Sequence, residues 1–182
     1  RRGLFRSDMA YLKAHGRVTG FDWGKFKARE GLTEGIMDAD FDYELSFYRV
    51  AHLIEHSKGA LRVLLKEGKY RGWDLQRQFA RYFKENGIAV DAEKLDFKEI
   101  KLNLSIDGEY VYVSGLQVQS DALNAAMFGF YSYLGGYEAT VNAGLRDLDS
   151  QFHSVSLACT GKFLNPCFKL RSAKQTGELC IK

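Results

Sequence analysis

The chain has 182 residues and a net charge of +3, and 46% of its residues are apolar. This length is enough for one domain with a full core. The small net charge and the lack of any lysine or arginine run argue against the strongly basic class of nucleic-acid-binding proteins, so we expect no nucleic-acid partner. No run of about 18 apolar residues is present, and the sequence therefore predicts no membrane-spanning helix.

The N-terminal part of the chain is expected to differ from the rest. Residues 1–37 predict an irregular arm that is rich in glycine and aromatic residues. Within this arm, residues 6–15 indicate a short helix that Gly16 ends. The remaining residues, 38–182, are expected to form a single α+β domain.

A long helix is predicted directly after the arm. Asp38, Asp40 and Asp42 precede an apolar run, and we interpret them as carboxylates that cap free backbone N–H groups at the start of a helix. The alternative is a calcium loop, but the glycine and the later glutamate that such a loop needs are missing. The helix itself is expected over residues 43–67, because its apolar residues form one stripe.

Two more helices are expected further along the chain. One spans residues 73–85, and Asn86-Gly87 closes it in the usual manner of a helix C-terminus. The other runs from about residue 120 to residue 134 and is apolar on nearly all sides, which is typical of a buried helix.

The clearest structural signal is a β-hairpin over residues 98–119. Its first half alternates apolar and polar residues, which is the period of a half-buried strand. Asp107-Gly108 follows, a dipeptide favoured in two-residue hairpin turns, and this turn would pair Leu104 with Val111. One face of the hairpin is then aliphatic, and the other carries two tyrosines.

Alternation returns near the end of the chain. It predicts three more strands, within residues 155–159, 168–170 and 179–181. Together with the hairpin they give an antiparallel sheet of about five strands. The predicted fold class is therefore α+β, with the N-terminal helices packed on this sheet.

One motif suggests a metal centre. His52, Glu55 and His56 match the H-x-x-E-H pattern of inverted zinc proteases, in which two imidazoles on one helix face hold zinc while the glutamate activates water. Both histidines lie opposite the apolar stripe of the predicted long helix, and no third ligand is identified. We therefore favour solvent-exposed histidines and no cofactor, with a zinc-dependent hydrolase as the alternative.

The three cysteines all lie near the C-terminal end. They are Cys159, Cys167 and Cys180, and their odd number favours free thiols and a cytoplasmic location over a disulfide framework. A disulfide between Cys159 and Cys167, or a metal held by them, stays open. Export also stays open, because the chain begins at Arg1 without methionine.

The candidate ligand site is aromatic. Side chains from the hairpin and from the helix predicted to follow it can converge, and they either fill a core or line an apolar pocket with a few hydroxyl groups. No phosphate-binding loop, dinucleotide motif or serine-hydrolase elbow is present, so we name no catalytic residue. The candidate ligand-binding residues are Tyr110, Tyr112, Phe128, Phe130, Tyr131 and Tyr133.

Four stretches carry a resemblance to a known family. They are residues 65–72 before a helix, the hairpin, the apolar segment 127–130, and the span 159–168 with a cysteine near each end. In this order they resemble the 4-vinyl reductase-type domain, a fold shared with small subunits of vesicle-tethering complexes and with sensor domains of aromatic-responsive bacterial regulators. The family's acidic residue before the first cysteine is absent, since Ser156 and Leu157 stand there. The resemblance implies a module that binds a hydrophobic ligand or a protein partner.

Three functions follow from these features. We favour a non-enzymatic module that binds a small apolar molecule or a protein partner, with self-association left open. The zinc-dependent hydrolase is the second hypothesis. The third is a structural subunit of a secretion or surface assembly.

Overall fold

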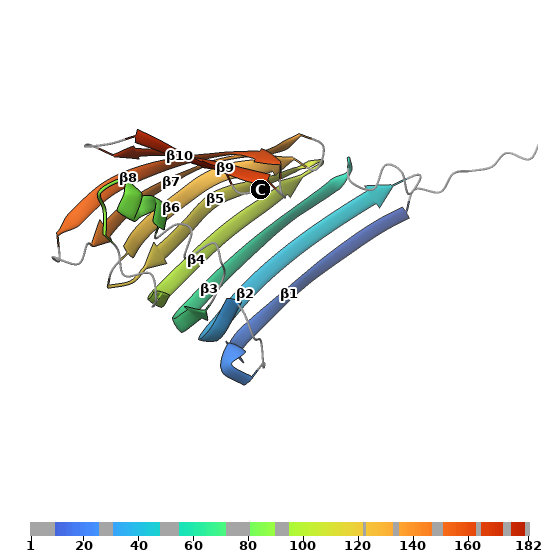
Figure 1. Cartoon of the computed structure of the whole chain (residues 1–182). Helices are drawn as coiled ribbons and strands as arrows, with labels where there is room; N and C mark the ends of the chain where they lie inside the picture. The colour runs from blue at the N-terminus through green and yellow to red at the C-terminus, as the bar shows by residue number, and fades with distance from the viewer. Residues whose placement is uncertain are drawn as a thin grey trace, which may run out of the picture.

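The computed structural model describes ten segments of the chain, and their residues form one antiparallel sheet of ten strands. Each strand lies beside its neighbours in the sequence, so β1 and β10 are the edges of this sheet (Figure 1). A 3₁₀ turn, η1 (Trp23–Lys25), and the helical residues 81–85 complete the described structure. The described residues are 10–25, 31–47, 55–71, 81–89, 95–121, 123–132, 135–146, 151–162, 165–172 and 176–180.

The strands are long in the first half of the chain and shorter toward its end. The bounds are β1 (Ala10–Asp22), β2 (Gly31–Phe47), β3 (Ser57–Arg71), β4 (Leu95–Asp107), β5 (Tyr110–Gln119), β6 (Leu123–Ser132), β7 (Gly136–Arg146), β8 (Phe152–Lys162), β9 (Asn165–Ser172) and β10 (Thr176–Cys180).

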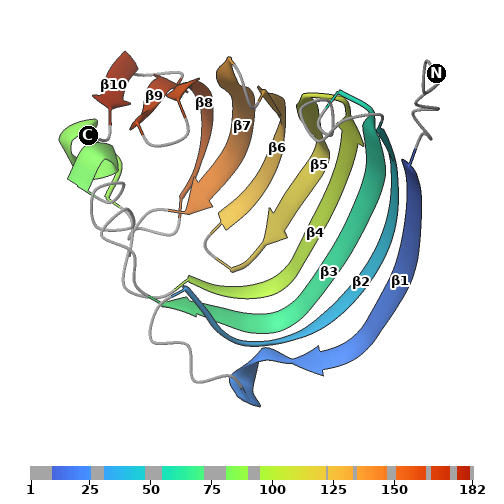
Figure 2. The ribbon, with the colours of Figure 1, turned by 90° about the vertical axis from the view of Figure 1, so that its right-hand side faces the viewer.

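The sheet is arched rather than flat. Figure 2 shows the strands curving around a common inner side, on which the helical residues 81–85 lie below the end of the sheet formed by β8–β10. Tyr82, Phe83 and Ile88 from this region pack against Leu157 and Leu170 in one buried cluster. The face that carries these two leucines is therefore the concave face, and the opposite face is convex.

Strict alternation separates apolar from polar side chains on the two faces. In β3, Leu61, Val63 and Leu65 lie opposite Leu104, Leu102 and Ile100 of β4, so one face is aliphatic over both strands. The register carries this aliphatic row to Val113 and Leu116 in β5, to Met127 in β6 and to Val141 in β7. The concave face is thus apolar from β3 to β7, and this row continues through Leu157 of β8 to Leu170 of β9.

The predicted α+β fold class is wrong. The described chain is nearly all strand, with ten strands instead of about five and a single short helix. Residues 10–15 belong to β1, and residues 43–47 and 57–67 belong to β2 and β3, where helices were expected. The third predicted helix is replaced by β6. Tertiary pairing with neighbouring strands overrides the helical stripes that the sequence offered in these segments.

Parts of the prediction are confirmed. The hairpin exists as β4 and β5, and the three C-terminal strands exist as β8, β9 and β10. The turn lies one residue further along than expected, at Gly108 and Glu109, so Leu104 pairs with Val113 rather than with Val111. Because this slip moves the partner by two residues, the face assignment is unchanged.

The end of the predicted second helix is also confirmed. The helix ends at Glu85, and Gly87 follows with a φ of 76°. The Ile88 amide donates to the Phe83 carbonyl at 2.8 Å, and the Gly87 amide donates to the Lys84 carbonyl at 3.0 Å. This pair of bonds is the glycine-terminated helix end that Asn86-Gly87 predicts.

The expected division of the chain at residues 37 and 38 falls inside β2, which pairs with β1 on one side and with β3 on the other. In the part of the chain that the structure describes, no helix is long and apolar enough to cross a membrane.

Candidate functional site

Three of the predicted ligand-binding aromatics form a cluster on the convex face. The rings of Tyr110 and Tyr112 stack with centroids 5.9 Å apart. Phe130 of β6 lies 6.0 Å from Tyr110 and 6.3 Å from Tyr112, which is within the range of favourable aromatic contacts. We call these three residues the aromatic cluster.

Two of the other predicted aromatics, Phe128 and Tyr131, do not join this cluster. Phe128 is on the same strand and face as Phe130, but it is 50% exposed. Tyr131 lies in the aliphatic row opposite Val111, and therefore on the concave face. Tyr133 lies outside the described residues. The sheet therefore divides the predicted site between two faces, because neighbouring residues of a strand point to opposite sides.

A hollow adjoins the aromatic cluster at one end of the sheet. It lies where β5 and β7 begin and where β6 and β8 end. Glu138 lies opposite Phe130 on one side and Thr160 on the other. The Glu109 carboxylate accepts a hydrogen bond from the Tyr110 hydroxyl, which raises the pKa of Tyr110 above its usual value. The residues lining this hollow are Glu109, Tyr110, Phe130, Ser132, Gly135, Gly136, Tyr137, Glu138, Thr160 and Gly161.

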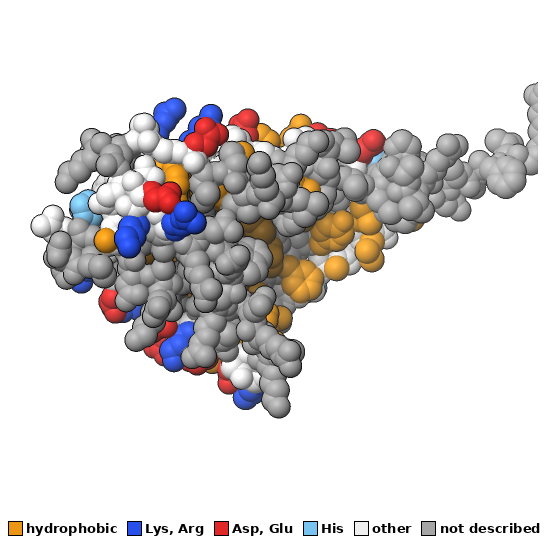
Figure 3. Space-filling model, viewed as in Figure 1, with side chains coloured by type: hydrophobic (Ala, Val, Ile, Leu, Met, Phe, Trp, Pro, Cys, Tyr) orange, Lys and Arg blue, Asp and Glu red, His pale blue; other side chains and the backbone are white. Residues whose placement is uncertain are grey.

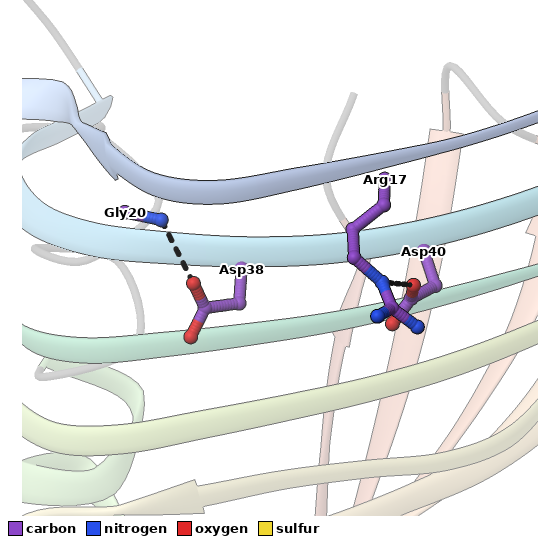
Figure 4. Close-up of polar contacts among 4 residues, drawn as sticks. All are labelled: Arg17, Gly20, Asp38 and Asp40. Atoms are coloured by element: carbon purple, nitrogen blue, oxygen red, sulfur yellow. Dashed lines mark hydrogen bonds and ion pairs between the residues drawn. The ribbon is translucent and has the colours of Figure 1, made fainter.

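Charged residues on the convex face are paired across the first strands. Figure 4 shows Arg17 of β1 beside Asp40 of β2, and the Gly20 amide pointing to an Asp38 carboxylate oxygen. The hydrogen bond from Gly20 to Asp38 is 2.9 Å long. Asp38 also lies 3.9 Å from the Lys66 ammonium of β3. Asp38, Asp40 and Asp42, which the sequence interpretation made helix caps, are alternate residues of strand β2. At least two of them face cations on adjacent strands. The helix-cap interpretation is therefore wrong.

The concave face is unevenly covered. At its β7–β9 end, Val155, Leu157 and Leu170 are 4%, 7% and 1% exposed, beneath the helical region. At its β1–β2 end, Leu12 and Phe41 are 52% and 40% exposed. Figure 3 shows hydrophobic side chains gathered on this side of the molecule, in the half nearer β1.

Phe41 has a specific place on this face. Gly16 is its partner in β1, and a Cβ atom on Gly16 would lie 2.5 Å from the Phe41 ring. The ring therefore lies over the glycine and covers backbone that has no side chain of its own. This arrangement holds an exposed aromatic surface at the open end of the concave face.

The described residues of the helix that the zinc hypothesis requires are not helical, since they belong to β2, to a turn and to β3. Glu55 and His56 lie in a turn before β3, whereas His52 lies outside the described residues. A turn does not impose the i, i+4 spacing on which the H-x-x-E-H argument rests. Among the described residues, no group of three or more histidine, cysteine or acidic side chains is placed to hold a metal ion.

The cysteines have different environments. Cys159 is free and buried on the concave face, and burial raises the pKa of its thiol to about 11. Cys167 is disulfide-bonded. Since Cys159 is free, the disulfide considered between these two residues is not formed. In backbone register, Cys167 lies opposite Cys180 of β10.

Further candidate site residues, which the sequence analysis did not name, lie on β1, β2 and β7. Leu12 and Phe41 belong to an alternating pattern, and the run from Asp38 to Leu45 shows this pattern plainly. Glu138 lies beside Phe130 through strand register, and no sequence signal predicts this. No family model, no curated protein and no solved structure matches the chain.

Proposed function

We propose that the chain is a non-enzymatic binding module that holds an elongated apolar molecule, of the acyl-chain class, on its concave face. One observation carries this proposal: the face carries apolar residues from β1 to β9, yet it is buried at the β7–β9 end and exposed at the β1–β2 end. Leu12, Val18 and Phe41 are exposed together on this face, and apolar side chains gathered in this way favour a binding site. The Cys159 thiol on this face is buried with a raised pKa, which favours packing over nucleophilic chemistry.

The shape of the sheet favours a flexible chain over a folded partner. The strands arch around the concave face, so a rigid convex surface would have to match this curvature, whereas an acyl chain can follow it (Figure 2). The helical residues 81–85 close one end of the face and leave the other open. Such a site would take its ligand from the β1–β2 side.

The test is binding of the fluorescent fatty acid cis-parinaric acid, with oleate as competitor. We expect its fluorescence to rise on addition of the protein and to fall when oleate displaces it. Phe41→Ala should weaken binding about tenfold, since a buried aromatic side chain contributes roughly 1.5–3 kcal/mol.

Phe128→Ala is the matched control. Phe128 is similarly exposed but lies on the convex face, so its removal should leave the affinity unchanged. Equal weakening by both substitutions, or no binding by the native protein, would refute the concave site. If the native protein binds no fatty acid, the hypothesis of a protein-interaction module would take precedence.

A further inference from the structure

The hollow beside the aromatic cluster has the features of a second binding site, on the face opposite the proposed acyl-chain site. Its lining residues include two members of the aromatic cluster, Tyr110 and Phe130, and two glutamates, Glu109 and Glu138. Strand register fixes this combination, because Phe130 and Glu138 are direct partners in β6 and β7. The rings are in turn held together by their edge-to-face contact at 6.0 Å.

The charge of the hollow is negative among its described lining residues. Its described lining residues include two glutamates and neither lysine nor arginine. On the same face of β1 and β2 the negative charges are balanced, because Asp40 and Glu44 are each paired with a cation of β1. Two carboxylates of like charge, with no cation among the described lining residues, favour a cationic ligand.

We propose that this hollow binds a quaternary ammonium group, such as that of choline. A methylated ammonium presents a diffuse positive charge to aromatic ring faces and needs no hydrogen-bond acceptor of its own. The two carboxylates supply the opposite charge at the rim. A hard inorganic cation fits less well, because it requires several oxygen ligands at close range.

The experiment measures binding of choline to the full chain by calorimetry, with 3,3-dimethylbutan-1-ol as its uncharged isostere. Choline should bind and the alcohol should not, since the two differ only in the charged atom. Tyr110→Ala and Glu138→Gln should each weaken choline binding about fivefold or more. Tyr110 is 36% exposed and Glu138 is also exposed, so both variants should fold normally.

Phe128→Ala is the control here as well, because Phe128 lies on the same strand and face but does not line the hollow. The affinity of the Phe128→Ala variant for choline should equal that of the native protein. Vesicles of phosphatidylcholine, compared with vesicles of phosphatidylglycerol, distinguish a lipid headgroup from a free compound as the source of the ammonium group. Equal binding of choline and the alcohol, or unchanged affinity in Glu138→Gln, would overturn the proposal.

Discussion

Burial decides the chemistry of individual residues in this protein. The Cys159 thiol is 4% exposed, on the concave face opposite Phe168. Burial disfavours the charged thiolate and raises its pKa from 9.0 to about 11. The sequence alone placed three cysteines close together, but it could not show which of them is buried, because the strand register that decides this is a long-range property.

The first prediction concerns the reactivity of this thiol. At pH 8, a rise in pKa of two units lowers the thiolate fraction about a hundredfold, since the thiolate is lost when the pH lies below the pKa. Cys159 in the native protein should therefore react slowly with DTNB, and unfolding in urea should restore rapid reaction. The rate should increase as the pH rises toward 11. A native thiol that reacts as fast as the unfolded one would contradict its burial.

At the scale of elements, the docking of the helical region on β9 rests on Tyr82. Its hydroxyl oxygen accepts a hydrogen bond from the Leu170 amide at 3.1 Å, and both residues are buried. Gly177 of β10 makes room for this contact, because a Cβ atom there would lie 3.0 Å from the same hydroxyl oxygen. The described helix thus depends on tertiary contacts as well as on its own sequence.

The second prediction compares two tyrosines. Tyr82→Phe should lower the free energy of unfolding by about 0.5–1.5 kcal/mol, because it removes one buried hydrogen bond. Tyr137→Phe should be neutral or stabilising, because the Tyr137 hydroxyl is buried with no hydrogen-bond partner. Urea denaturation of both variants provides the measurement. The opposite order of stabilities would show that the hydroxyl of Tyr82 does not hold the helical region in place.

A strand of this protein can be predicted from the sequence where its apolar and polar residues alternate cleanly. The β4–β5 hairpin has one aliphatic and one polar face, so period two was evident and the faces were assigned correctly. In β6, Phe128 and Phe130 lie on one face and Met127 and Tyr131 on the other, so apolar residues on both sides concealed the alternation. The segment was consequently predicted as a buried helix. In β2 the pattern was visible, but aspartate is rare in strands and the capping interpretation prevailed.

At the scale of the whole molecule, ten strands in sequence order give a sheet with one core at one end. Such an arrangement could not be derived from local patterns. The sequence of a hairpin alternates in the same way whether its apolar face is covered by a helix or left exposed. Leu145, Val155 and Leu170 are buried at the β7–β9 end, whereas Val18 and Phe41 are exposed near β1. The stability of the sheet should therefore fall from β9 toward β1.

The third prediction tests this gradient by amide hydrogen exchange. β2 and β9 form a matched pair, since each lies directly beside an edge strand of the described sheet. Amides of β9 should exchange more slowly than those of β2, because local opening of β9 exposes Leu170, whereas Phe41 in β2 is already 40% exposed. Oleate bound to the concave face should then slow exchange in β1–β4 and leave β9 unchanged. Equal protection of β2 and β9 in the free protein would mean that burial of the concave face does not set the stability of the sheet. Protection by oleate confined to β9 would place the apolar ligand at the closed end of the face, beneath the helical region.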